Sequence, residues 1–301
     1  MIWGTITAET AVLLHDGRSD NPMRFLRLPG GAASIPGSSL KGMIRSVVET
    51  VGPGCWWRSD EGQGAGAIPR DFRSCADRSA LCPACRLFGF LGAGSDASAL
   101  LGAAAFLDAI AQQEVRLEPV WVGPFGSPKP QRRAWYFPNG AVAGRKFYCH
   151  HVPTFLRSDP GRGKRLEPLG AGSSFRFSAR FDNVAEDDWA LLLSALVLEP
   201  ALRHKLGYGK PAGLGSVRIE IDRIEFLPPP GSDGRSQRLL EGDALRQYLD
   251  QQTEAFRRRT DPTLTALRRI WGWPPAAGVT YRYPSLQWFR ANPAAPLSAT
   301  R

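Results

Sequence analysis

The sequence predicts an α+β fold, because its segments follow one another in the order strand, helix, strands, helix and strand. Residues 2–14 and 217–226 alternate between apolar and polar side chains, as half-buried strands do. Residues 40–48 instead repeat apolar side chains at helical spacing. The simplest closed arrangement is a ferredoxin-like sandwich, in which two helices cover one face of an antiparallel sheet.

Length and charge indicate the number of domains and the kind of partner. The chain has 301 residues, a size for one large domain with insertions or for two small domains. A formal net charge of +10 and a pI of about 9.8 favour a polyanionic partner. Nucleic acid is the default partner, and a membrane surface is the weaker option. No apolar run could span a bilayer and no signal peptide is recognisable, so we expect a cytoplasmic protein.

The first helix is expected to bind an anion at its N-terminus. A Pro-Gly turn at residues 36–37 precedes it, and Ser38 or Ser39 is a natural N-cap. Lys41 and Arg45 are four residues apart, which places both on the solvent side of a helix that runs to about residue 51. Free amides, the helix dipole and these cations together favour a phosphate. An ordinary capped amphipathic helix is the alternative.

The middle of the chain combines loops with short strands. Residues 15–34 form a polar loop, and residues 52–98 form an irregular insertion. The pattern then predicts strands at about 100–108, 114–122, 144–151 and 173–182, with basic loops at 123–144 and 156–170. Asp182 or Asn183 is expected to cap a second helix, which ends before Pro200.

A glycine-rich loop at residues 206–216 precedes the last core strand. Its glycines rule out a helix and let the backbone approach a ligand closely. We expect this loop and the tip of the first helix to lie side by side and to cradle a ribose-phosphate chain. Beyond residue 227 the sequence predicts a helix near 238–258, a short helix near 262–272 and an irregular aromatic end.

Four of the five cysteines predict a structural zinc site. Cys82 and Cys85 form a C-x2-C knuckle, and Cys55 and Cys75 complete a tetrahedral set. A closed four-thiolate site would supply folding energy to the glycine-rich insertion and would take no part in catalysis. Free thiols or two disulfides are the alternatives, although disulfides suit a cytoplasmic protein poorly. Cys149 is expected to be a small core residue.

Two further groups offer RNA chemistry. His150 and His151 could act as general acid and base, with a packed, hydrogen-bonding histidine as the alternative. Arg132 and Arg133 stand beside aromatic residues at 135–137, as cations and rings do in grooves for single-stranded RNA. Those aromatic side chains could equally fill the core.

Three motifs together resemble the RAMP superfamily of CRISPR-associated proteins. They are IPGSSLKG at residues 35–42, CPACRLFG at residues 82–89 and the glycine-rich loop, in the family's order. The chain looks most like the backbone subunits of type III effector complexes, over about residues 1–225. The resemblance implies a modified ferredoxin-like (RRM-type) core, with a thumb-like hairpin, that polymerises along a CRISPR RNA.

The resemblance also implies an activity. In catalytic backbone subunits, an aspartate in the loop before the Pro-Gly-Ser-Ser helix cuts target RNA with a divalent metal such as magnesium, and the neighbouring 2′-hydroxyl attacks. In this chain the loop carries Asp20, at the matching distance from Ile35, and Asp16 as the reserve. Such chemistry requires only alignment, a metal and a proton transfer. Asp20 as a simple turn residue is the alternative.

These arguments give one set of expectations. We expect residues 1–226 to form the RAMP domain, with a zinc-binding insertion at about 52–98 and a thumb at about 123–170, and residues 227–301 to form an extension. The expected partners are CRISPR RNA, target RNA and other effector subunits, including copies of the same chain. The alternatives are a non-catalytic architectural subunit, a metal-independent guide-RNA-processing endoribonuclease and a zinc-ribbon protein that binds duplex DNA. The predicted RNA contacts are Ser38, Ser39, Lys41, Arg45, Arg132, Arg133, Arg145, Lys205, Gly207, Tyr208, Gly209, Lys210, Gly213 and Gly215.

Overall fold

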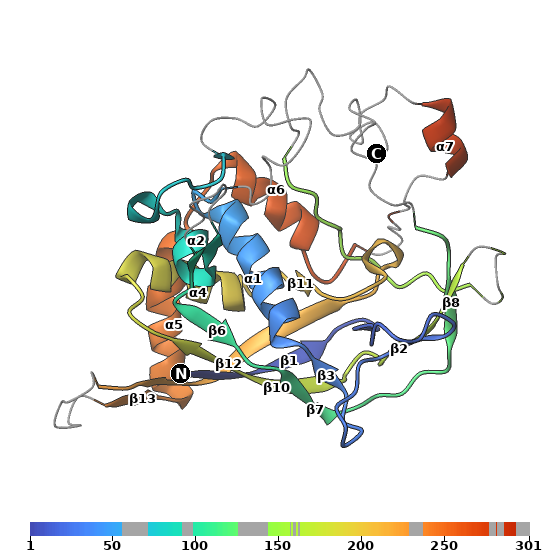
Figure 1. The fold of residues 1–301 in the computed structure, drawn as a ribbon, viewed down its shortest axis with the longest axis horizontal. Helices are drawn as coiled ribbons and strands as arrows, with labels where there is room; N and C mark the ends of the chain where they lie inside the picture. Colours follow the sequence, from blue (N-terminus) through green and yellow to red (C-terminus); the bar gives the residue numbers. More distant parts are fainter. Residues whose placement is uncertain are drawn as a thin grey trace.

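An antiparallel sheet forms the base of the molecule (Figure 1). The computed structural model describes residues 1–55, 72–91, 99–125, 144–156, 158, 161, 163–228, 237–276, 281 and 286–292. The sheet order is β11-β12-β1-β10-β7-β3, with β13 paired to β12 and β6 paired to β10. The strands are β1 (Ile2–Ala8), β3 (Ser34–Ile35), β6 (Ala104–Phe106), β7 (Ala109–Gln113), β10 (Ser174–Phe181), β11 (His204–Lys205), β12 (Ser216–Phe226) and β13 (Arg238–Leu240). The expected α+β class with an antiparallel sheet is confirmed.

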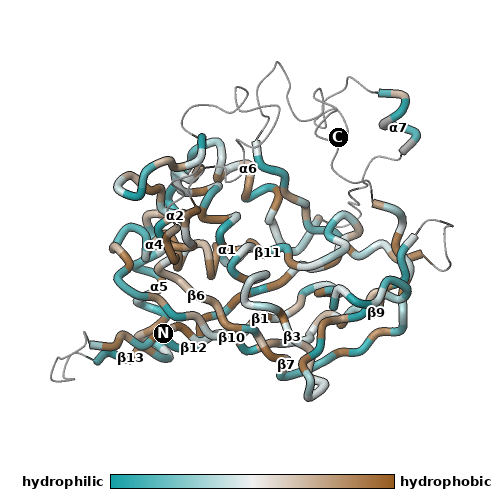
Figure 2. Tube along the Cα trace, in the orientation of Figure 1, coloured by the Kyte–Doolittle hydropathy of each residue, from teal (hydrophilic) through white to brown (hydrophobic). Residues whose placement is uncertain are grey.

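Helices cover one face of this sheet, as Figure 1 shows. They are α1 (Gly37–Val51), α2 (Pro83–Phe88), α4 (Glu186–Val197), α5 (Gly242–Arg257) and α6 (Pro262–Trp271), and a short α7 (Leu286–Ala291) follows. Alternate residues of β1 are buried, among them Ile2 and Ile6, because only one face of the strand meets the helices. In Figure 2 hydrophobic residues recur along the central strands and α4, where the core lies.

Two smaller sheets extend the fold. One has the order β2-β9-β8, from Met23–Arg24, Lys164–Glu167 and Val120–Val122. The other pairs β4 (Phe90–Leu91) with β5 (Ala99–Leu100) beside the cysteine-containing insertion. Two 3-10 turns, Arg78–Ala80 and Lys210–Ala212, lie in the insertion and in the glycine-rich loop. No helix in the described part of the chain combines the length and the apolar character needed to cross a membrane.

Several predicted boundaries are wrong, each for a local reason. The first strand ends at Ala8 because the chain then turns, and Val12 donates its amide to Leu169. Residues 144–151 form no strand, because side chains and not a ladder hold them. Residues 238–240 pair with β12 as β13, so the following helix begins only at Gly242.

The predicted serine N-cap of the first helix is also wrong. Helix α1 begins at Gly37, with Pro36 as N-cap and no side-chain cap bond. The amide of Gly37 donates instead to Oδ1 of Asp108, at 2.8 Å, so a distant carboxylate satisfies one of the free N–H groups. Helix α4 likewise begins after Ala185, because Asn183 adopts a φ of 46° and turns the chain before the helix.

The segment beyond residue 226 packs against the rest of the protein. Helix α5 contacts α4 and β12, and helix α6 contacts α1. Nη1 of Arg259 donates to the carbonyl of Val51, at 2.6 Å, at the end of α1. The guanidinium of Arg268 pairs with the carboxylate of Glu199, at 2.7 Å. The buried ring of Trp271 meets Phe147 edge-on, with 5.2 Å between ring centroids.

Candidate nucleic-acid interface and metal centre

Helix α1 and the glycine-rich loop line one cleft of about 460 Å³. The expected side-by-side placement of these two segments is therefore confirmed. A third wall comes from residues 146–148, and the end of α6 closes the cleft with Trp271. The described residues that line it are Leu14, Ser39, Gly42, Met43, Ser46, Val47, Lys146, Phe147, Tyr148, His204, Lys205, Leu206, Gly207, Lys210 and Trp271.

The charge of the cleft is positive. Three of its described lining residues, Lys146, Lys205 and Lys210, are lysines, and none is acidic. Nζ of Lys205 donates to the carbonyls of Gly213 and Leu214, at 3.1 and 2.9 Å. Burial lowers the pKa of Lys205 to about 7 and also lowers the pKa of Lys210. Because desolvation disfavours both ammonium groups, an anion in the cleft would restore stabilisation that water otherwise gives them.

Glycine is required where the loop passes under the cleft. Gly207 has a φ of 81°, and a Cβ there would stand 2.3 Å from the carbonyl oxygen of Leu13. A Cβ at Gly215 would stand 1.9 Å from the carbonyl oxygen of Leu206. Gly42 on α1 is different, because a Cβ there would meet nothing within 4 Å. Gly42 lines the cleft and leaves the helix backbone open to a ligand.

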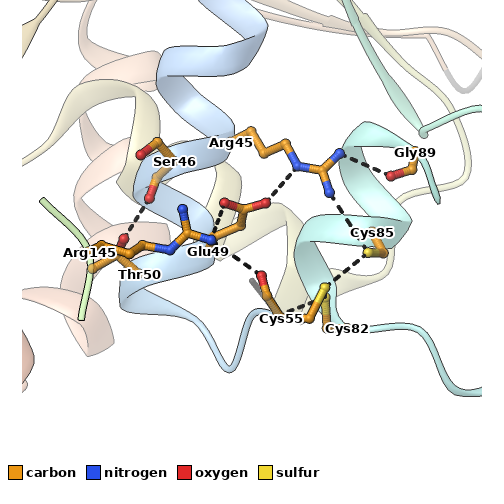
Figure 3. A network of polar contacts seen from close by, with 9 residues as sticks. All are labelled: Arg45, Ser46, Glu49, Thr50, Cys55, Cys82, Cys85, Gly89 and Arg145. Atoms are coloured by element: carbon orange, nitrogen blue, oxygen red, sulfur yellow. Dashed lines mark hydrogen bonds and ion pairs between the residues drawn. The ribbon is translucent and has the colours of Figure 1, made fainter. Parts of the chain in front are cut away.

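The other predicted RNA contacts lie in different places relative to the cleft. Ser38 is exposed and Lys41 is half-buried at the start of α1, and burial and Arg45 lower the pKa of Lys41. Tyr208, Gly209 and Gly213 form the loop behind the cleft, where the ring of Tyr208 packs edge-on against Phe125. Arg132 and Arg133 lie outside the described residues. Arg45 and Arg145 are absent from the described lining of the cleft and face the cysteines instead (Figure 3).

The two loop aspartates have different surroundings. Oδ1 of Asp16 accepts hydrogen bonds from the amides of Arg18 and Ser19, at 2.9 and 3.1 Å, and these bonds lower the pKa of Asp16. Asp16 therefore holds the loop in shape. The carboxylate of Asp20 is 87% exposed and lies 3.9 Å from Nζ of Lys164. Of the two carboxylates, Asp20 is the more accessible to a metal ion or to RNA.

The histidines are built into the core. Nδ1 of His150 lies 2.8 Å from Oγ of Ser216, and Nε2 lies 3.0 Å from the carbonyl of Arg203. Burial lowers the pKa of His150 to about 3 and also lowers the pKa of His151. Both rings are therefore neutral near pH 7 and hold residues 150–151 in place. This geometry suits the packed alternative better than general acid–base catalysis.

Four cysteines meet beside the C-terminal half of α1. The sulfur atoms of Cys55, Cys75, Cys82 and Cys85 all lie within 4.8 Å of one another. Sγ of Cys55 lies 3.6 Å from Sγ of Cys85 and 3.7 Å from Sγ of Cys82. These separations are too long for disulfides, whose sulfurs are about 2.05 Å apart. They match the separation of about 3.8 Å expected when four thiolates surround zinc at about 2.3 Å.

The thiols of the cluster also shift one another's pKa values. Hydrogen bonding among the thiols raises the pKa of Cys55 to about 12 and that of Cys85 still further, and it lowers the pKa of Cys82. The raised pKa values of Cys55 and Cys85 mean that the cluster disfavours ionisation of all its thiols together when no cation is bound. A metal ion would supply the positive charge that lets all four ionise.

A buried ion network joins this cluster to α1, as Figure 3 shows. The carboxylate of Glu49 accepts from Nε of Arg45, at 2.7 Å, and from Nη2 of Arg145, at 2.5 Å. Nη2 of Arg45 reaches Sγ of Cys85, at 3.9 Å. Nη2 of Arg145 donates to the carbonyl of Cys55, at 3.3 Å. The expectation that Arg45 points to solvent is wrong, because the insertion covers that side of α1.

Sequence reasoning did not single out several residues of the site. Lys146, Tyr148 and Trp271 line the cleft from segments whose place was not predictable from local pattern. Glu49 had a usable signal, since a carboxylate four residues after Arg45 on a helix predicts an ion pair. Its second partner, Arg145, has no signal in the sequence.

Comparison with known proteins gives a family and a structural neighbour. A family model described as the RAMP superfamily matches residues 5–218, more than half of the chain. A solved structure described as "Type IV-B CRISPR Complex" contains a similar chain, with 19% sequence identity and a TM-score of 0.43. That match covers 78% of this chain and 97% of the other. No curated protein matches this sequence.

Proposed function

The chain belongs to the RAMP superfamily, and on that basis we propose that it is a CRISPR RNA-binding subunit of an RNA-guided effector complex, resembling those of type III. The observation that carries the proposal is the cleft between α1 and the glycine-rich loop. The cleft joins an open helix wall at Gly42 to lysine ammonium groups, with no acidic side chain among its described lining residues. This combination suits the phosphates and riboses of single-stranded RNA.

The order of the strands supports a ferredoxin-like core. In the sequence β1, α1, β6–β7, β10, α4 and β12, the central strands β1 and β10 lie side by side, and β12 and β7 flank them. Both helices pack on the same face of the sheet (Figure 1). We propose that such a domain places the cleft at the end of α1, where successive subunits could share one RNA in the cytoplasm.

Salt titration tests the binding proposal. Each phosphate neutralised on single-stranded RNA contributes about −0.7 to the slope of log affinity against log salt. Replacing Lys205 and Lys210 together by glutamine should weaken binding and reduce the size of the slope by about 1.4. Arg246→Gln is the control, because Arg246 is an exposed cation on α5. Equal losses in the double variant and in the control would refute the cleft as the RNA site.

We propose that the cysteine cluster holds zinc as a structural ion. Cys55, Cys75, Cys82 and Cys85 fit it by their sulfur spacing, by their number and by the guanidinium of Arg45 close to Cys85. A closed tetrathiolate leaves zinc without an open coordination position, so its contribution is to folding. Metal analysis of the purified protein should find about one zinc per chain.

Cutting of target RNA is a finer part of the proposal and depends on Asp20. Its exposed carboxylate projects from the loop between β1 and β2, and one carboxylate with RNA phosphates can hold a magnesium ion. Such an ion would stabilise charge while the 2′-hydroxyl attacks. Asp20→Asn should abolish magnesium-dependent cleavage by the assembled complex and leave RNA affinity intact. Unchanged cleavage would favour an architectural subunit or a different catalytic residue.

A further inference from the structure

The ion network around Glu49 connects the cysteine cluster to the wall of the cleft. Residues 144–148 have no ladder partner, yet residues 146–148 of this segment line the cleft. Two residues beyond one end of the segment, the ring of His150 contacts Oγ of Ser216 and the carbonyl of Arg203. At the other end, the guanidinium of Arg145 attaches it to the carboxylate of Glu49 and to the carbonyl of Cys55.

The position of Arg145 therefore depends on two groups. Glu49 fixes it to α1, which forms the facing wall of the cleft. The carbonyl of Cys55 fixes it to the cluster, and a metal bound by Cys55 would hold that carbonyl in one place. Lys146 follows Arg145 directly, so its backbone begins at the same anchor, and its ammonium group lies over the ring of Tyr148, 4.9 Å from the centroid.

Charge reinforces this link. Arg45 and Arg145 bring two positive charges to the cluster and Glu49 brings one negative charge, which leaves one net positive charge facing the sulfurs. Four thiolates around a divalent ion carry a net charge of −2, and that charge attracts both guanidinium groups. Without the metal, the sulfurs carry less negative charge and attract the guanidinium groups less strongly. The carboxylate of Glu49 is only 6% exposed, so the interaction lies in a medium that screens it weakly.

We propose that Glu49 and Arg145 are positioning residues that couple metal binding at the cysteine cluster to RNA binding in the cleft. The inference rests on the proposed RNA-binding function and on the proposed zinc site. Zinc fixes Cys55 and thereby Arg145, and the ion pair of Arg145 with Glu49 holds the segment that begins at Lys146 at its place in the cleft. Because coupling between two binding sites is reciprocal, RNA must raise zinc affinity by the same factor by which zinc raises RNA affinity.

The test uses full-length protein, zinc and a short fluorescein-labelled single-stranded RNA. RNA affinity is measured by anisotropy with and without zinc, and zinc affinity is measured by competition with a chromophoric chelator, with and without RNA. In the native protein each ligand should strengthen the other about fivefold or more. In Arg145→Gln the factor should fall to about one while the four cysteines still bind one zinc.

Arg145→Gln is preferred to Glu49→Gln because it leaves Glu49 paired with Arg45, so that no buried carboxylate loses all its partners. Arg258→Gln is the matched control, since it also removes one arginine but from an exposed ion pair with Glu254 at the C-terminal end of α5. The control should keep the native coupling. A native coupling factor of one, or a native factor in Arg145→Gln, would overturn the inference.

Hydrogen exchange separates this inference from the proposed function. Without RNA, zinc should slow amide exchange of residues 144–149 in the native protein. In Arg145→Gln, zinc should slow exchange around residues 82–88 and leave residues 144–149 unchanged. If the protein binds no RNA, the proposed function is wrong. Hydrogen exchange still tests whether metal binding at the cysteines orders residues 144–149. Zinc-independent exchange of residues 144–149 in the native protein would refute it.

Discussion

Replacement of Gly42 by alanine should move stability and RNA affinity in opposite directions. Gly42 lies inside α1, where glycine is about 1 kcal/mol less favourable than alanine. A Cβ at this position meets nothing within 4 Å, so the free protein accepts the methyl group without strain. We expect the variant to be about 1 kcal/mol more stable, which corresponds to a rise in Tm of about 2–4 °C for a domain of this size.

The same methyl group should weaken RNA binding. Gly42 lines the cleft, so the added Cβ occupies space that a bound ribose or phosphate would use. Overfilling a packed contact costs about 1–3 kcal/mol. That cost corresponds to a loss of affinity of about five- to 150-fold. Glycine in a helix interior lowers the stability of the free protein, and no contact of the free protein requires it at this position. A ligand that approaches this wall closely explains why glycine is present.

Thermal unfolding and fluorescence anisotropy measure the two effects on the same preparations. Gly30→Ala is the control, because Gly30 is exposed in a loop away from the cleft and its Cβ would also meet nothing within 4 Å. The control should bind RNA as the native protein does. A Gly42→Ala variant that is more stable yet binds RNA with native affinity would show that RNA does not contact this wall.

Four further predictions concern pH, the metal and helix α6. RNA affinity should fall as pH rises from 6 to 9, because Lys205 has a pKa of about 7 and loses its charge there; Lys205→Met should flatten this profile in anisotropy. Without RNA, burial lowers the pKa of Lys205 below its value in the unfolded chain. The buried ammonium group should therefore lower the free energy of unfolding by its full amount below pH 7 and by progressively less towards pH 10. Denaturant titration at several pH values measures this change. A zinc chelator should lower Tm in calorimetry, and added zinc should restore it, whereas an unchanged Tm would argue against a structural ion. Trp271→Ala should weaken RNA binding and destabilise the fold by about 3–5 kcal/mol, because it removes a buried ring that packs edge-on against Phe147. Trp271→Phe keeps a six-membered ring at this place and should restore most of both properties.

The sequence predicted those parts of the fold that depend on local pattern. Helix α1 ends at the expected residue because its apolar stripe is continuous up to Val51. Strand β12 and the meeting of the four cysteines follow from alternation and from ligand spacing. Local pattern did not predict the cap of α1, because a residue distant in sequence supplies the hydrogen bond there. Asp108, which accepts the amide of Gly37, is 71 positions away in sequence.

The candidate site was predicted in the same uneven way. The glycine-rich loop and the helix tip were identified because glycine at a positive φ and a helix start both leave signals in the sequence. The burial of Arg45 was not predictable from local pattern, because the cysteines place the insertion over this side of α1. Residues 144–151 resembled a strand in composition, yet they form no backbone ladder. Their side chains bond instead to Arg203, to Ser216 and to the glycine-rich loop at Pro211, and Phe147 packs on α6.

Photocrosslinking of RNA that contains 4-thiouridine tests the central claim most directly. The crosslinked peptides of the full-length protein would be identified by mass spectrometry. The account predicts crosslinks to residues 39–47, 146–148 and 204–210, which are the three principal walls of one cleft. Crosslinks confined to the uncovered face of the sheet, around Trp3 and Arg223, would contradict it.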